Sequence, residues 1–587
     1  RSPALILFED AHWADPATLG FLGRLVDRIR GKRVLLLITH RPDFTPPWSA
    51  AAHIASIRLD GLGRDDCGAM VERLAGGKRL PETVIDEIVA TTGGIPLYVE
   101  EVTKTLLASG MLEEGPDGYM LAGPLEPLTI PASLNDSLMA RLDKLGHAKD
   151  VAQVAAILGR TFTRTQLTAI SPVTEEELEG AIAQLVEADV IRPVSTHGGQ
   201  AYDFRTPLLR DVAYQSLLLS KRRELHLRAA QLLERVYTGT SETEPELLAH
   251  HYASAGLNER AIAYWRRAAE RASERYASTV AIGHLKRALD LLPALPETRS
   301  RDKHELVIRS ALGTALLAVR GYAEEGVLIN FTRARELAER IGSDHERFRA
   351  IRGLCLHSLM RGEHTTANRL ADECLQLAEQ VQDQPCVMEG HRLAGTCAFY
   401  TGRFGVSRVH MEKVVAIYDP RRDGHLAGAF GQDPGVMARI YLAWTLWITG
   451  HTEQALTTMN EAVALARQLG HPQSLILALY FATHLHLFRA EPADAQRHAA
   501  SCLELARRDG LPFRTAMATI AEGCALAADG SFAKAEERLR EGIALWRENG
   551  AELAVTLFAG TLANVCLNAG RLDGAWEALG EARQLEE

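Results

Sequence analysis

The sequence lacks the features that define several large classes of protein. No apolar run among its 587 residues approaches the roughly 20 residues that a membrane-spanning helix requires. The net charge of -10 leaves no basic excess for general nucleic-acid binding. The 8 cysteines form no Cys-x-x-Cys pair, which favours reduced, buried thiols. With no signal-peptide pattern from Arg1 onward, these absences predict a cytoplasmic protein without a membrane segment.

The first apolar stretch ends in adjacent carboxylates. Residues 4–8 are apolar, and Glu9 and Asp10 follow them. This pattern predicts a buried parallel strand whose carboxyl end delivers acid groups to a site at the sheet edge. One carboxylate there would hold a nucleotide-bound Mg²⁺, and the other would polarise an attacking water. A buried strand that runs into an acidic helix cap explains the same residues.

Three further stretches complete the pattern of this region. Residues 34–39 form a second apolar run, and His40-Arg41-Pro42 comes at its end. Residues 54–59 alternate enough to predict a third strand. Farther along, Thr92-Gly93-Gly94-Ile95-Pro96 precedes an apolar helix.

Together these motifs resemble the ATPase core of STAND-type signalling NTPases, a branch of the AAA+ class. The similarity is to bacterial predicted ATPases that carry C-terminal TPR repeats and often follow a class III adenylate or guanylate cyclase domain. The resemblance implies that Glu9 and Asp10 are the Walker B pair and bind Mg²⁺ through the nucleotide. It implies that Arg41 is the sensor arginine near the γ-phosphate of ATP. It also implies that Gly94 and Pro96 form a nucleotide-binding Gly-x-Pro motif, in which Pro96 lies against the adenine.

The phosphate-binding loop of that family is absent. No Gly-x-x-x-x-Gly-Lys-[Ser/Thr] occurs anywhere in the sequence. Without its lysine and backbone cradle, phosphate binding is expected to be badly impaired. We therefore expect an N-terminally truncated fragment, inactive alone, whose longer parent binds ATP and Mg²⁺.

The middle of the chain predicts a helical lid and a regulatory spacer. Residues 112–128 indicate a hairpin-like excursion or linker, with Gly115-Pro116-Asp117-Gly118 at a turn. Helices near 165–170 and 175–188, then strands near 190–191 and 202–204, have the order of a winged helix. Its second helix is acidic, which argues against DNA contact. The resembled family has a histidine that senses the nucleotide where this chain has Thr206, so a switch contact there is doubtful.

The C-terminal half is repetitive, with a period of about 40 residues, and it predicts paired helices that approach closely. Small residues stand seven before and five after each turn. The turn residues are Gly362, Gly402, Gly450, Ala490, Gly530 and Gly570; the small residues before them are Cys355, Gly395, Ala443, Thr483, Gly523 and Ala563; those after them are Ala367, Ser407, Ala455, Ala495, Ala535 and Ala575.

One longer gap interrupts this period. It contains Tyr418-Asp419-Pro420-Arg421-Arg422 and Gly431-Gln432-Asp433-Pro434-Gly435, which predict an inserted loop between two repeats. The loop is either a binding loop on the solenoid or a connector held by its Pro and Gly turns.

The predicted fold is mainly α. It comprises part of an α/β P-loop NTPase core (1–60), a helical lid and linker (61–130), a winged-helix-like spacer (131–240) and a TPR-like α-α superhelical solenoid (241–587). The predicted function is ATP-dependent signalling, with a protein partner on the repeats and a nucleotide cyclase upstream in the parent. Two alternatives remain: a large ATP-binding transcriptional activator without its DNA-binding domain, and a non-catalytic TPR scaffold.

Overall fold

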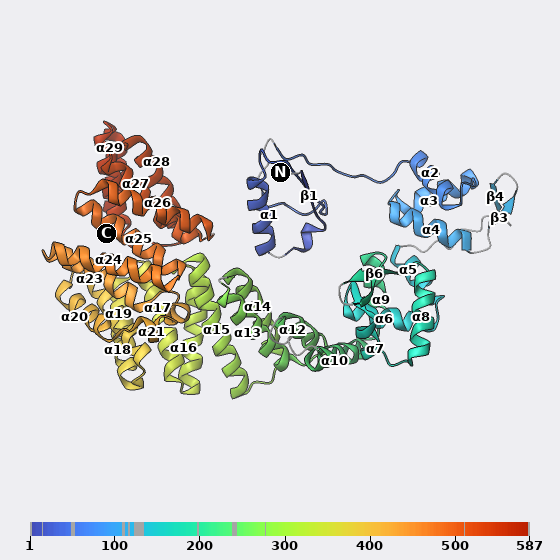
Figure 1. Ribbon diagram of the computed structural model, residues 1–587, viewed down its shortest axis with the longest axis horizontal. Coiled ribbons are helices and arrows are strands. Elements are labelled where there is room, and N and C mark those ends of the chain that lie inside the picture. Colours follow the sequence, from blue (N-terminus) through green and yellow to red (C-terminus); the bar gives the residue numbers. More distant parts are fainter. Residues whose placement is uncertain are drawn as a thin grey trace. The chain divides into compact units, whose positions relative to one another are not determined.

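The structure is a computed structural model that describes residues 3–14, 16–48, 53–108, 112–115, 118–121, 134–196, 199–236, 244–275, 277–509 and 511–584. The chain divides into two compact units, Arg1–Ala261 and Ile262–Glu587. Both are mainly helical (Figure 1). Each unit is described by itself below.

The first unit opens with two strands. Strands β1 (Ala4–Phe8) and β2 (Val34–Ile38) pair in parallel, with Ala4 opposite Val34. Between them lie η1 (Ala11–Trp13) and α1 (Pro16–Arg28). The two predicted strands are therefore confirmed.

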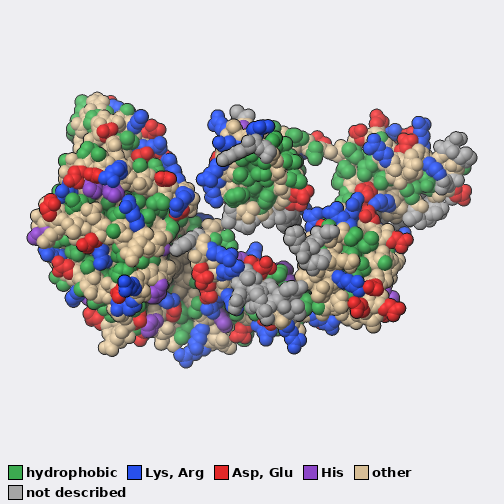
Figure 2. Space-filling view, in the orientation of Figure 1, with side chains coloured by type: hydrophobic (Ala, Val, Ile, Leu, Met, Phe, Trp, Pro, Cys, Tyr) green, Lys and Arg blue, Asp and Glu red, His purple; other side chains and the backbone are tan. Residues whose placement is uncertain are grey.

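The prediction that these strands are buried is wrong. The side chains of Leu5 and Leu35 are 69% and 65% exposed, because this sheet has two strands and presents its apolar residues to solvent. Figure 2 shows hydrophobic side chains gathered on this segment. The third strand predicted over 54–59 is also wrong: these residues form neither helix nor strand, and Ile57 and Leu59 are 79% and 89% exposed. Alternation alone does not make a strand without an edge to pair with.

A small helical segment follows. Its helices pack around a core that includes Val71, Ile88 and Val99. The predicted hairpin is confirmed over the antiparallel pair β3–β4, and its continuation over 122–128 lies outside the described residues. The elements are α2 (Arg64–Leu74), α3 (Glu82–Thr92), α4 (Pro96–Ala108), β3 (Leu112–Gly115) and β4 (Gly118–Leu121).

The next segment has the predicted order of helices and strands. Its three-stranded antiparallel sheet has the order β5-β7-β6, and Phe162, Leu167 and Phe204 lie in its core. Capping boxes begin α7 and α8, at Thr163 and Thr174. Its classification as a winged helix stays a prediction. The elements are α5 (Leu134–Asp143), α6 (His147–Leu158), β5 (Thr161–Thr163), α7 (Arg164–Ile170), α8 (Glu175–Glu187), β6 (Ile191–Thr196), β7 (Gly199–Phe204) and α9 (Pro207–Gln215).

A buried histidine pair joins the last helices of this unit, α10 (Leu219–Val236) and α12 (Pro245–Ser254). His226 Nδ1 lies 2.9 Å from His251 Nδ1, and His226 Nε2 lies 2.9 Å from the Tyr214 hydroxyl. Burial, helped by the nearby charges of His250 and Arg222, lowers the pKa of His226 to about 4. Burial, helped by His226 and His250, lowers the pKa of His251 to about 3. Both imidazoles are therefore neutral at pH 7.

The second unit is an array of antiparallel helix pairs. Its first helix, α13, begins in the last residues of the first unit. Every predicted turn residue has a left-handed backbone: φ is 75° at Gly362, 74° at Gly402, 88° at Gly450, 58° at Ala490, 79° at Gly530 and 74° at Gly570. The helices are α13 (Asn258–Glu274), α14 (Ser278–Leu291), η2 (Leu292–Ala294), α15 (Arg299–Arg320), α16 (Glu325–Ile341), α17 (Asp344–Met360), α18 (His364–Val381), α19 (Gln384–Tyr400), α20 (Phe404–Ile417), α21 (Pro420–Asp423), α22 (Leu426–Phe430), α23 (Pro434–Ile448), α24 (Thr452–Leu469), α25 (Pro472–Phe488), α26 (Pro492–Arg508), α27 (Pro512–Ala528), α28 (Phe532–Glu548), α29 (Val555–Asn568) and α30 (Leu572–Gln584).

The predicted small residues lie where paired helices touch. A Cβ atom added to Gly395 would lie 2.8 Å from Met411 Cε, and one added to Gly523 would lie 2.8 Å from Leu539 Cγ. Cys355 Sγ reaches the Ala367 carbonyl at 3.4 Å. The TPR-like prediction is thus confirmed at the level of helix pairing.

The array curves until its early helices meet its late ones. Arg514, which is in α27, donates a hydrogen bond of 3.2 Å to the hydroxyl of Tyr322, which follows α15. The Met360 carbonyl at the end of α17 accepts backbone N–H groups from Glu552 and Leu553, at 2.8 and 3.0 Å. The repeats therefore close on themselves around an interior.

No helix in the described part of the chain has the length and apolar character needed to cross a membrane.

The close helix contacts predict opposite effects at two helical glycines. Gly523→Ala places a methyl group against Leu539, so we expect a loss of about 1–3 kcal/mol in the free energy of unfolding. Gly560→Ala, within α29, meets nothing within 4 Å, and we expect a gain of about 0.5–1 kcal/mol. Urea unfolding followed by circular dichroism measures both. Equal effects at the two sites would contradict this account of the small residues.

The histidine pair predicts a loss of stability in mild acid. In the unfolded chain both imidazoles bind protons below pH about 6.5, whereas the folded pair does not until about pH 4, so stability present above pH 6.5 falls as the pH falls. We expect a loss of about 2 kcal/mol per histidine between pH 7 and pH 5. The double variant His226→Leu/His251→Leu should lose that part of the dependence. Hydrogen exchange of α10 and α12, corrected for intrinsic rates, measures it, and an unchanged dependence in the variant would refute the assignment.

Candidate functional site

The predicted Walker B carboxylates lie at the carboxyl edge of the β1–β2 sheet. Asp10 has a left-handed backbone, with φ 58°, and its N–H donates to Thr39 Oγ1 at 2.9 Å. The Ala11 N–H donates to the Thr39 carbonyl at 2.8 Å. Glu9 and Asp10 are exposed, and these bonds place them beside the end of β2, where the exposed Arg41 follows. Carboxylate oxygens in this setting suit a hydrated Mg²⁺ ion, with the cationic Arg41 close in sequence to Thr39.

Gly94 and Pro96 belong to a different segment. The Gly94 carbonyl accepts the Leu62 N–H at 2.8 Å, and a Cβ atom on Gly94 would lie 2.2 Å from the Leu62 carbonyl oxygen. Gly94 has φ 72°, so both its conformation and its close contact require glycine. Pro96 is the first residue of α4. The contacts that fix both residues come from the helical segment, whereas Glu9, Asp10 and Arg41 are placed by the β1–β2 sheet.

Thr206 caps a helix. Its Oγ1 accepts the backbone N–H of Leu209 at 3.3 Å, at the start of α9. This is the bond that a serine or threonine makes at an N-cap. The doubtful role of Thr206 as a nucleotide switch stays a prediction.

The helix that begins at Pro96 is tied to the next segment by buried charge. Glu101 on α4 is 4% exposed and accepts from Arg141 Nη1 on α5 at 2.6 Å. Arg141 also donates to the Ala188 carbonyl, after α8. Lys104, one turn along α4, lies 3.4 Å from Asp189. Glu101 and Lys104 therefore connect α4 to α5 and to the residues that follow α8.

The second unit contains a small, partly open cavity of about 60 Å³. Its wall is rich in aromatic side chains from helices spread over the array. They are Tyr322, Tyr400, Tyr441, Tyr480, Phe481, Phe513, Trp546 and Phe558.

A buried ion cluster lies in this interior. Glu389 accepts from Arg352 Nε at 2.6 Å and from Arg392 Nη2 at 2.7 Å, and only Arg392 of these three lines the cavity. Burial alone would raise the pKa of Glu389, but the two guanidinium groups outweigh it and hold that pKa below its ordinary value. The cluster carries a net charge of +1.

A second cation in the wall has no carboxylate partner among the described residues. Arg514 is 3% exposed, and its hydrogen bonds go to the Tyr322 hydroxyl at 3.2 Å and to Met517 Sδ at 3.3 Å. Its guanidinium lies 5.5 Å from the Phe513 ring centre. A buried charge without an ionic partner is costly, and it marks this cavity as electropositive.

The predicted insert contributes to the same wall. It forms α21 and α22, and Tyr418 donates from its hydroxyl to Asp433 Oδ2 at 2.8 Å across its ends. Gln432 reaches the cavity and donates to the Tyr322 hydroxyl. Both interpretations of the insert, as a binding loop or as a connector, stay predictions.

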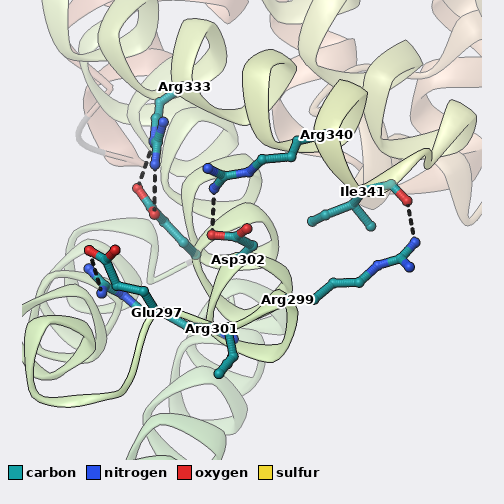
Figure 3. A pocket seen from close by; sticks show the side chains of 9 residues that line it. Glu297, Arg299, Arg301, Asp302, Arg333, Arg340 and Ile341 are labelled. Atoms are coloured by element: carbon teal, nitrogen blue, oxygen red, sulfur yellow. Dashed lines mark hydrogen bonds and ion pairs between the residues drawn. The ribbon is translucent and has the colours of Figure 1, made fainter.

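A larger groove of about 520 Å³ lies between the start of α15 and the end of α16 (Figure 3). Its charges are largely paired: Arg340 with Asp302, Arg333 with Glu305 at 3.0 Å, and Arg301 with Glu297 at 3.5 Å. Arg299 donates to the Ile341 carbonyl at 2.7 Å. Because these charges neutralise one another, a charged ligand would gain less electrostatic stabilisation in the groove than in the inner cavity.

Sequence reasoning missed the buried charges of the repeat unit. These are Arg392 and Arg514, which line the cavity, and Arg352 and Glu389, which lie beside it. A charged residue at an apolar position of a repeat was the available signal, since such residues are rarely fully buried unless they are paired.

The folded chain is thus a helical repeat protein with a smaller α/β and helical N-terminal unit. No protein-family model matches it. An uncharacterized protein of Rhizobium meliloti (strain 1021) is 26% identical over an alignment of 593 residues. The alignment covers 99% of this chain and 56% of that protein. The chain therefore spans about half the length of this curated relative.

Solved structures with similar helical architecture include a STAND protein with a tetratricopeptide repeat sensor from Pyrococcus horikoshii, with a TM-score of 0.49 and 14% identity over 99% of this chain and 80% of that one. A Rap protein complexed with competence and sporulation factor has a TM-score of 0.42 and 15% identity, over 55% of this chain and 87% of that one. The Rap conjugation gene regulator of plasmid pLS20, in complex with the Phr* peptide, has a TM-score of 0.37 and 12% identity, over 77% and 97%. These likenesses assign no activity.

The buried ion cluster predicts a large effect on stability. Glu389→Ala leaves two buried guanidinium groups without their shared carboxylate, so we expect a loss of about 3–5 kcal/mol in the free energy of unfolding. Glu461→Ala is the control: Glu461 is 59% exposed and 3.9 Å from Arg439, and its loss should change stability by less than about 0.5 kcal/mol. Thermal unfolding of both variants measures the difference, and similar midpoints would show that the cluster adds nothing.

Proposed function

We propose that this chain is the regulatory part of an ATP-dependent signalling protein of the STAND type, and that its repeat unit binds a protein partner. The observation that carries the proposal is the electropositive, aromatic cavity inside the closed repeats, where Arg514 has no ionic partner in the described structure. A buried charge of this kind is more costly than a well-packed apolar residue, and a ligand group that neutralises it recovers the cost.

The N-terminal unit supplies the nucleotide-dependent half of the proposal. Glu9 and Asp10 would hold Mg²⁺ on ATP, Arg41 would contact the γ-phosphate, and Gly94 and Pro96 would lie against the adenine. These two groups of residues lie in different segments, so a nucleotide that contacts both would draw the segments together, as in other ligand-driven domain closures.

Helix α4 connects the proposed nucleotide site to the next segment. The helix that starts at Pro96 holds Arg141 through Glu101, at 2.6 Å. Movement of Pro96 on nucleotide binding would therefore shift α5 and the end of α8. In a longer parent protein, the proposed output is regulation of an attached nucleotide cyclase.

The nucleotide proposal is tested by isothermal titration of ATP with Mg²⁺. We expect no measurable binding by this chain, and binding by a polypeptide from the same gene that extends upstream to include a phosphate-binding loop. Glu9→Gln/Asp10→Asn in the extended polypeptide should weaken binding by at least roughly tenfold, since it removes the charges that hold the metal.

Asp43→Asn is the matched control, because Asp43 is an exposed carboxylate in the loop after β2. It should leave binding unchanged. If neither polypeptide binds ATP, nucleotide dependence is wrong and the repeat scaffold is the function that remains. If the control weakens binding as much as the double variant, Glu9 and Asp10 have no special role.

A further inference from the structure

We infer that the turn between α25 and α26 of the repeat unit is a binding site for a Zn²⁺ ion. Its ligands are the side chains of His486, Glu491, Asp494 and His498. This inference goes beyond the proposed function, because it depends neither on nucleotide binding nor on the inner cavity.

Three of the four side chains converge on one point. His486, Glu491 and Asp494 each offer one ligand atom, and these atoms lie within 4.8 Å of one another. His486 Nδ1 lies 2.7 Å from Glu491 Oε2, whereas two ligand atoms on one tetrahedral Zn²⁺ ion are about 3.3 Å apart. The pair therefore has to open by only about 0.6 Å to admit an ion between its two atoms.

The fourth side chain, His498, lies against the first. The ring centres of His486 and His498 are 5.2 Å apart. Two imidazoles that bind one tetrahedral Zn²⁺ ion through nitrogen have ring centres about 5 Å apart, so this separation fits a shared ion. Burial, helped by the nearby charges of His486, Arg497 and Arg467, lowers the pKa of His498 to about 4. Its imidazole is therefore neutral at pH 7, as a metal ligand must be.

The sequence places three of the ligands on one face of α26. Glu491 is the N-cap residue, Asp494 lies in the first turn and His498 lies one turn further, so the three are spaced as i, i+3 and i+7. His486 comes from the last turn of α25, on the other side of the connection. The side chains of Glu491 and Asp494 are 32% and 38% exposed, which gives an ion access from solvent.

The full ligand set is particular to this repeat. The four ligands stand four residues before the turn residue Ala490 and one, four and eight residues after it. Around each of the other predicted turn residues, the sequence has at most one histidine, cysteine, aspartate or glutamate at these four positions. In the α17–α18 turn, Ser358 takes the place of His486 and donates to Glu363 at 3.0 Å. Closing the turn therefore does not require an imidazole, and acidic residues alone are common at helix N-termini.

The donor set selects a transition metal. Two imidazole nitrogens and two carboxylate oxygens suit Zn²⁺ in a tetrahedral site, whereas Mg²⁺ and Ca²⁺ take oxygen ligands.

Neighbouring cations share the carboxylates in the structure. Arg497 pairs with Asp494, and its side chain is 71% exposed, so it can turn to solvent when an ion binds. Arg489 donates to Glu491 Oε1 at 3.0 Å. It also lies 3.2 Å from Glu453, which continues to neutralise it when Glu491 binds the metal. An ion can therefore enter without leaving a buried charge unpaired.

The test uses the full chain, with Co²⁺ and Zn²⁺ as the probes. We expect Co²⁺ to show the strong visible absorption of a tetrahedral site and Zn²⁺ to displace it. His486→Ala and Asp494→Asn should each weaken Zn²⁺ binding at least roughly tenfold in isothermal titration. The visible absorption lost in these variants should have no accompanying ultraviolet band from a Co²⁺–thiolate bond, because the site contains no sulfur.

His451→Ala is the matched control. His451 is an exposed imidazole one residue after the turn residue Gly450, the position that Glu491 has relative to Ala490. Its replacement should leave Zn²⁺ binding unchanged. Asp494→Asn keeps the size of a partly exposed side chain, so it decides the test if His486→Ala does not fold.

The inference is wrong if Co²⁺ gives no tetrahedral absorption, or if Asp494→Asn binds Zn²⁺ as tightly as the parent chain. It is also wrong if Cys386→Ser, rather than His486→Ala, removes the absorption. That result would place the ion at a second group of possible ligands, formed by His345, Asp383 and Cys386. Variants that are less stable but bind Zn²⁺ normally would show that the contact of His486 with Glu491 only closes the turn. The ATP titration is independent of all these results.

Discussion

The hydroxyl of Tyr322 joins three parts of the repeat unit that are far apart in the sequence. Tyr322 follows helix α15 in the chain. Its hydroxyl accepts hydrogen bonds from Gln432 of the insert and from Arg514 of α27. The contact brings residues 192 positions apart into one hydrogen bond. Without such a closure the curved array would have an open interior, and the charges described above would face water. The closure is what gives the cavity its low exposure and hence its electrostatic strength.

The buried arginines show that this arrangement has an energetic cost. Arg352 and Arg392 are stabilised by one carboxylate, and Arg514 rests on a hydroxyl, a thioether and two aromatic rings. Cation–aromatic contacts are worth about 2 kcal/mol or more when they are desolvated, less than a buried ion pair demands. The interior is therefore organised for something other than maximal stability, which is common at binding sites.

Much of the repeat unit was predictable from the sequence. The small residues before and after the turns are buried, and Gly395 and Gly523 lie close against the paired helix. Each predicted turn residue has a left-handed backbone, even Ala490, where glycine is absent. The strand pairing of β1 with β2 was also predictable from two apolar runs. These features are local or periodic, so each can be recognised within a few tens of residues.

The cavity was not predictable in the same way. Whether Arg514 pairs with an acid depends on which side chains arrive from the insert and from α15, and no local pattern encodes that. The exposure of Leu5 and Leu35 was unpredictable for the same reason. An apolar run predicts a strand that is stabilised by burial, but the run does not specify which other residues would cover it. The role of Glu9, Asp10, Arg41, Gly94 and Pro96 stays a prediction because a nucleotide has to be bound to reveal it.

A solenoid that closes on itself has a fixed number of repeats. Open arrays grow or shrink by duplication of a repeat, because each unit contacts only its neighbours. Here one added helix pair between α17 and α27 would carry Arg514 away from Tyr322 and separate Met360 from Glu552 and Leu553. The number of helices between Tyr322 and Leu553 is therefore expected to be constant, because an added pair there would break these contacts.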